Sequence, residues 1–171
     1  MAWHPVVTGF VGGAIWGVVL RLWMRFISTR PGFTWSGTLA IISIAAFAGL
    51  ILGVLWWRRD AGGSPWWRLL GLGVLPVFSG AGVIMLPSVL LGAVGIGRTG
   101  WNRRIRMGLV VAGFGVPYLF LGPGSGEIPA GRLMPALAWF SVMLGIEMWA
   151  VSVVFRPWAS AERHREVDVM A

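Results

Sequence analysis

The sequence predicts an all-α integral membrane protein: a polytopic helical bundle of four full transmembrane helices plus one broken or kinked hydrophobic segment. Hydrophobic residues make up 57% of the 171 residues and charged residues only 12%, about half the charged fraction of a soluble domain. Long apolar runs recur along the chain, and about 18 apolar residues are enough to cross the hydrocarbon core. The basic residues, all of them arginine, lie mostly between these runs, where lipid headgroups would be.

One transmembrane domain is therefore predicted over residues 1–157, followed by a polar cytoplasmic tail at 158–171. The predicted spans are 5–27, 37–57, 69–97 (the broken segment), 107–121 and 133–155. The first span is expected to be a permanent helix and not a cleaved signal, because no arginine or lysine precedes it.

The first two spans carry small residues at helical spacing. Gly9, Gly13 and Gly17 recur every four residues and so share one face of the first span. Gly49 and Gly53 form a similar pair in the second span. Because such faces let two helix backbones approach closely in lipid, we expect glycine-rich helix packing here.

The segment 69–97 fits neither one straight helix nor two full spans. As one α-helix its 29 residues would be about 43 Å long, some 13 Å more than the hydrocarbon core needs. As two legs, each would be only about 18–22 Å long. The candidates for the break, and for lining a pathway through it, are Pro76, Ser79, Gly80, Gly82 and Pro87. Two alternatives stay open: five spans, or four spans plus a re-entrant hairpin.

The arginines predict which loops face the cytoplasm, because short cytoplasmic loops carry an excess of Lys and Arg. Arg21 is set aside as intramembrane. If the broken segment crosses once, nine of the other arginines lie inside and four outside; if it returns, the counts are ten and three. Both alternatives place the C-terminus in the cytoplasm, but they put the N-terminus on opposite sides. Exclusive use of arginine suggests a GC-rich genome, and we expect a multi-pass protein of a bacterial inner membrane.

A basic loop follows the broken segment. Its four arginines, Arg98, Arg103, Arg104 and Arg106, are expected to attract anionic lipid headgroups, by about 1 kcal/mol per basic residue near the surface. The net charge of +8 is therefore interpreted as membrane orientation and lipid attraction. Membrane lipids are the predicted partners, and nucleic acid is not.

Two charged residues lie well inside predicted spans, Arg21 and Glu147, whereas Arg25 is close enough to the end of the first span for its side chain to reach the headgroups. With five spans, the first and last helices run the same way and the two side chains lie at nearly the same depth, where an ion pair is feasible. With a returning segment, their depths differ by about 12 Å and the pair fails. Arg21 could instead extend its side chain to the headgroups. An ionisable residue inside the membrane is a functional candidate by default.

Several kinds of chemistry lack their residues. There is no cysteine, and the two histidines, His4 and His164, lie at opposite ends of the chain. The sequence contains no HExxH, GxSxG or phosphate-binding loop motif. We therefore predict no catalytic residues, no metal site and no cofactor.

The first two spans resemble, over about 40 residues, the first half of the small bacterial fluoride channels. The matching features are glycines 12–13 followed by Arg21, and GTL at 37–39 followed by Phe47. The resemblance implies a dual-topology dimer of four-span subunits with a broken third helix. The glycine-to-arginine spacing differs by one residue, however, and Ile42 stands where that family has a pore asparagine. The chain is accordingly not assigned to that family.

Two functions are carried forward. The first is a channel or transporter-like protein, motivated by the broken segment and the intramembrane Arg21 and Glu147. The alternative is a non-catalytic accessory or structural subunit that packs through its glycine faces against itself or a membrane partner. An enzyme acting on lipid is the weakest interpretation, because Glu147 would be its only intramembrane acid.

Overall fold

The computed structural model describes residues 4–28, 32–78, 83, 85–119 and 130–158, and within these ranges the chain is helical, with no strand. The elements are α1 (Pro5–Ile27), α2 (Trp35–Asp60), η1 (Pro65–Phe78), α3 (Leu86–Gly97), α4 (Arg103–Tyr118), η3 (Ala130–Arg132), α5 (Leu133–Val151) and η4 (Ser152–Val154). Those labelled η are 3₁₀ helices. A 3₁₀ helix as long as η1 is uncommon, and at about 2.0 Å per residue it reaches further than an α-helix of the same length.

Local sequence signals explain where two of the helices begin. His4 precedes α1, and its Nδ1 accepts a hydrogen bond from the backbone N–H of Val6 at 3.4 Å; Pro5 then occupies the first helical position, where its missing N–H costs nothing. Asn102 precedes α4, and its side-chain oxygen accepts from the backbone N–H of Arg104 at 2.9 Å. Both side chains satisfy backbone donors that the helix itself leaves free.

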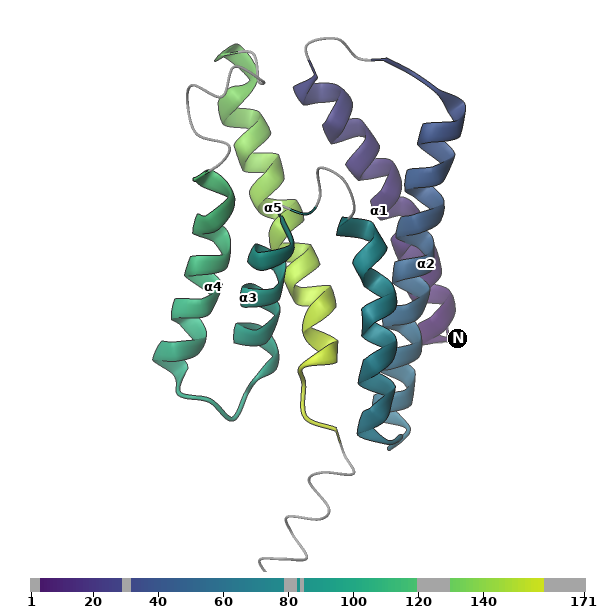
Figure 1. Ribbon diagram of the computed structural model, residues 1–171, viewed down its shortest axis with the longest axis vertical. Coiled ribbons are helices and arrows are strands. Elements are labelled where there is room, and N and C mark those ends of the chain that lie inside the picture. Colours follow the sequence, from purple (N-terminus) through teal and green to yellow (C-terminus); the bar gives the residue numbers. More distant parts are fainter. Residues whose placement is uncertain (1–3, 29–31, 79–82, 84, 120–129, 159–171) are drawn as a thin grey trace, which may run out of the picture.

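The elements form two groups (Figure 1). In the first, α1 and α2 pack antiparallel along much of their length, and η1 lies against α2. In the second, α3 packs against both α4 and α5. The core between the groups is formed by buried side chains such as Ile51, Leu55, Phe140, Leu144 and Met148.

The contact between α1 and α2 depends on glycines. A Cβ on Gly17 would lie 2.7 Å from the Cα of Ile42, and one on Gly49 would lie 2.8 Å from the Cα of Gly13. Gly9 faces the backbone of Gly49 just as closely. Since carbon atoms normally pack at about 3.5–4.0 Å, these backbones are near enough that a side chain would separate them.

The segment 65–97 enters the bundle and returns to the end it came from (Figure 1). η1 runs from the lower end of the figure upward, α3 runs back downward, and the upper ends of both lie below those of α1, α2 and α5. This is the course of the returning alternative, and α1 and α5 consequently run in opposite directions. Of the proposed break residues, Pro76 lies within η1 and Pro87 in the first turn of α3, whereas Ser79, Gly80 and Gly82 lie outside the described residues.

Three helices are long and apolar enough to cross a membrane: Pro5–Ile27, Trp35–Asp60 and Leu133–Val154, the last of these combining α5 and η4. α3 is apolar but shorter. α4 has 16 residues, and three of its first four are arginines. The described chain therefore fits a helical membrane protein with three candidate spans, and the predicted count of four full spans is not confirmed.

Candidate functional site: an apolar cavity with a buried carboxyl group

A cavity of about 550 Å³ lies between α1, α2, η1 and α5. The glycine and alanine faces of α1 and α2 form one wall, Val74 and Phe78 of η1 another, and Ile146, Glu147 and Trp149 of α5 the third. The volume is within the range of small-molecule sites, roughly 300–1,000 Å³. Gly12 helps to keep this space open, because a Cβ there would meet no atom within 4 Å, whereas Gly9, Gly13 and Gly49 belong to the close contact between α1 and α2.

Among the described residues that line this cavity, Glu147 is the one that is acidic or basic. The side chain is buried, with 8% of the residue exposed. Its Oε1 accepts a hydrogen bond of 3.1 Å from the indole N–H of Trp16 on α1. Its Oε2 is buried and has no hydrogen-bond partner in the described part of the chain. A buried polar atom left in that state costs about 1–3 kcal/mol, and more when it is charged.

The cavity opens sideways, between α1 and α5. Further up, these helices are tied together, because the indole N–H of Trp23 donates to the carbonyl of Ala136 at 3.2 Å. Lower down they separate, and four residues that line the cavity there are exposed: Thr8, Gly12, Ile146 and Trp149. In a bundle whose α1 and α5 cross a membrane, an opening between these two helices faces lipid.

An arginine borders the lower end of the cavity. The rings of Trp56 and Trp149, which line it, lie 5.7 Å apart between centroids. The guanidinium of Arg156 lies 5.4 Å from the ring of Trp56 and 6.0 Å from that of Trp149. Arg156 itself is not part of the lining, so its charge is separated from the cavity by the two indoles.

The structure does not join Arg21 to Glu147. Arg21 Nε donates to Thr38 Oγ1 at 3.1 Å, and its Nη2 donates to the carbonyl of Gly32 at 3.4 Å, so its partners lie on and just before α2. Because α1 and α5 are antiparallel, Arg21 is near the upper end of the bundle, whereas Glu147 is in the last two turns of α5 and near the lower end.

The four arginines assigned to lipid headgroups have different surroundings. Arg103 and Arg104 are exposed, and the guanidinium of Arg98 lies 5.9 Å from the ring of Trp101. Arg106 instead turns back on α3, where its Nε donates to the carbonyl of Gly95 at 3.0 Å. A positive charge there favourably meets the negative end of the α3 dipole.

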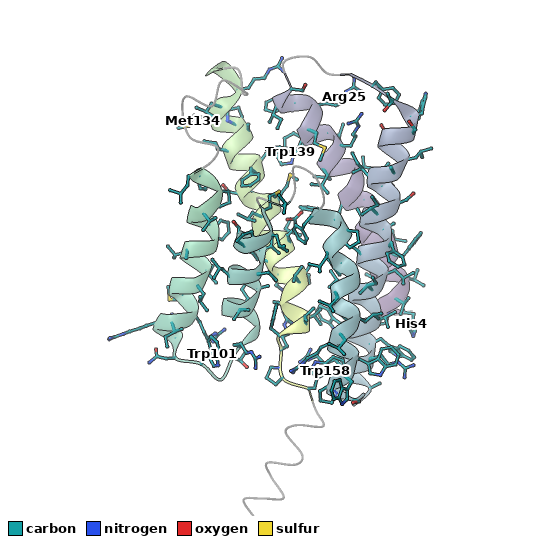
Figure 2. All side chains as sticks on the ribbon, in the orientation of Figure 1. His4, Arg25, Trp101, Met134, Trp139 and Trp158 are labelled. Atoms are coloured by element: carbon teal, nitrogen blue, oxygen red, sulfur yellow. The ribbon has the colours of Figure 1, made fainter. Side chains whose placement is uncertain are left out.

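Arginines and tryptophans alternate at the lower end of the bundle, a cluster that the sequence analysis missed. Arg58 lies 4.6 Å from the ring of Trp57 and 4.3 Å from that of Trp67. Arg68 lies 5.9 Å from Trp158. Figure 2 labels Trp101 and Trp158 at this end and Arg25 and Met134 at the opposite one. The adjacent W and R letters in 56–59, 65–68 and 156–158 were the available signal.

The described residues contain no group of three His, Asp or Glu that could hold a metal ion. No known protein family, curated protein or solved structure matches the chain. The cavity and Glu147 are therefore the features on which a function can be argued.

Proposed function

We propose that this chain is a small transporter-like membrane protein that binds a cation at Glu147. The observation that carries the proposal is the unpartnered Oε2 of a buried carboxyl group in the wall of an open cavity. A carboxyl group kept inside a membrane protein is expensive, and such groups mark ion and substrate pathways. A broken segment beside the site adds support, because transporters place their sites at interrupted helices.

The proposal includes a topology. α1, α2, α4 and α5 cross the bilayer, and the segment 65–97 returns without crossing. Of the described arginines, eight flank element ends at the lower end of Figure 1: Arg58, Arg59, Arg68, Arg98, Arg103, Arg104, Arg106 and Arg156. Arg25 and Arg132 flank the upper end, and Arg21, inside α1, is left out of the count as an intramembrane residue. By the positive-inside rule the lower end faces the cytoplasm of a bacterial cell, together with both ends of the described chain.

Single cysteines test this topology on the natively cysteine-free sequence. Replacements at Gly62 and Gly100 should react with a membrane-impermeant maleimide only from the cytoplasmic side, and one at Gly32 only from the opposite side. Reaction of positions 62 and 100 from opposite sides would mean that the segment 65–97 crosses the bilayer.

A flux assay tests the transport function. Purified protein in liposomes receives a pH gradient, reported by an internal dye, and then Na⁺, K⁺ or a quaternary ammonium ion on the opposite side. We expect at least one cation to dissipate the gradient, and Glu147→Gln to slow this at least tenfold. Asp60→Asn removes a carboxylate from the exposed end of α2 and should leave the rate unchanged. Equal rates in wild type, Glu147→Gln and empty liposomes would refute the proposal.

One observation favours the second function, an accessory subunit. α4 packs mainly on α3 and presents Gly108, Ala112 and Gly115 on its exposed side, a small-residue face suited to another helix. Purification in mild detergent, with the mass of the complex measured, distinguishes the two functions. A monomer that is free of partners and still catalyses flux would exclude the accessory role.

A further inference from the structure

We propose that the occupant of the cavity is an amphiphilic organic cation: an apolar body with one ammonium group, taken up from the bilayer. The inference rests on the proposed function and specifies its ligand.

The lining selects an apolar body. Apart from Thr8, Trp16 and Glu147, the cavity is lined by glycine, alanine, proline, aliphatic and aromatic residues. A hydrated inorganic ion would lose its water ligands on entering this cavity, and one carboxyl group would not replace them. An organic cation keeps most of its surface against apolar walls and needs only one polar partner.

Glu147 supplies that partner. Trp16 occupies Oε1 and holds the carboxyl group in place from α1, whereas Oε2 has no partner among the described residues. A lipid acyl chain in the cavity would leave Oε2 as it is. A protonated amine donates a hydrogen bond to Oε2, and a quaternary ammonium, which has no N–H, is attracted by the charge of the carboxylate. The site therefore distinguishes a cation from a neutral molecule of the same shape. Trp16 itself adds an aromatic surface, which attracts cations.

The surrounding charges do not compete for Oε2. Arg59 donates to the carbonyl of Pro157 at 3.0 Å, and Arg68 donates to the carbonyl of Arg156 at 2.9 Å. Arg156 lies against Trp56 and Trp149, outside the lining. The lateral opening beside Thr8 and Gly12 would admit the ligand from lipid, so an amphiphile already in the bilayer would reach the carboxyl group without first passing into water.

The test compares two probes of one shape. Benzyltrimethylammonium and its neutral isostere neopentylbenzene differ only in that nitrogen and its charge replace carbon. Binding of radiolabelled benzyltrimethylammonium to protein in lipid nanodiscs is measured against empty nanodiscs, with neopentylbenzene as competitor. We expect one cation per chain, bound at least tenfold more tightly than the isostere.

Three variants locate the site. Glu147→Gln keeps an oxygen that can accept from Trp16 and removes the charge, and it should weaken cation binding at least tenfold. Gly12→Leu adds a side chain at the opening, where a Cβ meets no atom within 4 Å, so it should block the cavity while the helices still pack. Asp60→Asn should bind as wild type does.

Two results would overturn the inference: equal affinity for the two probes, or unchanged cation binding in both Glu147→Gln and Gly12→Leu. Either would mean that the cavity takes neutral chains such as lipid. These failures are distinct from failure of the transport function. Flux of Na⁺ or K⁺ without binding of the organic cation would remove the ligand class alone, and binding without flux would remove transport but keep the site.

Discussion

Replacing Gly49 with alanine should destabilise the protein, although alanine is the better helix former. In a helix interior the change from glycine to alanine is worth about 0.5–1 kcal/mol in favour of folding. At Gly49, however, the added Cβ would lie 2.8 Å from the Cα of Gly13, about 1 Å inside normal carbon contact. Overpacking of this kind costs about 1–3 kcal/mol. We expect a net loss of about 1–2 kcal/mol.

Gly108→Ala is the matched control. Gly108 lies in α4, is exposed, and a Cβ there meets no atom within 4 Å, so only the propensity gain of up to about 1 kcal/mol remains. The free energies of unfolding of the two variants should therefore change in opposite directions, by a difference of about 1–3 kcal/mol, or roughly 5- to 150-fold in the folding equilibrium. The assay is reversible unfolding in mixed micelles, followed by tryptophan fluorescence. Stabilisation of the protein by both substitutions would refute the close packing of α1 on α2.

Three further outcomes follow from single contacts. Trp16→Phe removes the hydrogen-bond donor to Glu147 and should lower the free energy of unfolding by about 1–3 kcal/mol in the same assay. The double variant Trp16→Phe/Glu147→Leu should be destabilised less than Trp16→Phe alone. An equal or greater destabilisation would argue against the hydrogen bond. Arg106→Ala should lower the free energy of unfolding by about 1–2 kcal/mol, because it leaves carbonyls at the end of α3 without a donor. Amide hydrogen exchange should become faster at that end of α3 and not in α1, and an equal increase in both helices would contradict the prediction. Tyr118→Phe breaks the bond to Ser141 that links α4 to α5 and should cost about 0.5–1 kcal/mol, which a Ser141→Ala background should abolish.

The helical class is readable from sequence because it depends on local properties. Hydrophobic length and the scarcity of charge suffice for α1, α2 and α5, which begin and end near the limits of their apolar runs. The direction of the segment 65–97 is not local. The two alternatives differed by a single arginine in their charge counts, a margin too small to decide how η1 and α3 are placed.

In the candidate site, too, the sequence reveals single residues but not the contacts between distant ones. Glu147 stands out in the sequence as an acid within an apolar run, but its partner Trp16 is 131 residues away, and nothing in the pattern joins them. Arg21 was weighed as the partner of Glu147 because both are ionisable. In the structure its nearest acceptor is Thr38, 17 residues along the chain, which the antiparallel pairing of α1 and α2 brings alongside. The opposite charges of Arg21 and Glu147 suggested an ion pair, but the antiparallel arrangement of α1 and α5 keeps the two side chains apart.

The hydrogen bond between Trp23 and Ala136 fixes α1 to α5 near the upper end, so small rotations of α1 about this point move its lower end most. From Trp23 down to Thr8 the helix extends about 22 Å, so a pivot of about 5° at this hydrogen bond would move Thr8 by about 2 Å, close to half the width of a methyl group. Lower down, within the described chain, the hydrogen bond from Trp16 to Glu147 also joins α1 to α5. Because the proposed ligand pairs with Oε2 and leaves Oε1 to Trp16, α1 would stay bound to α5 at both points while the site is occupied.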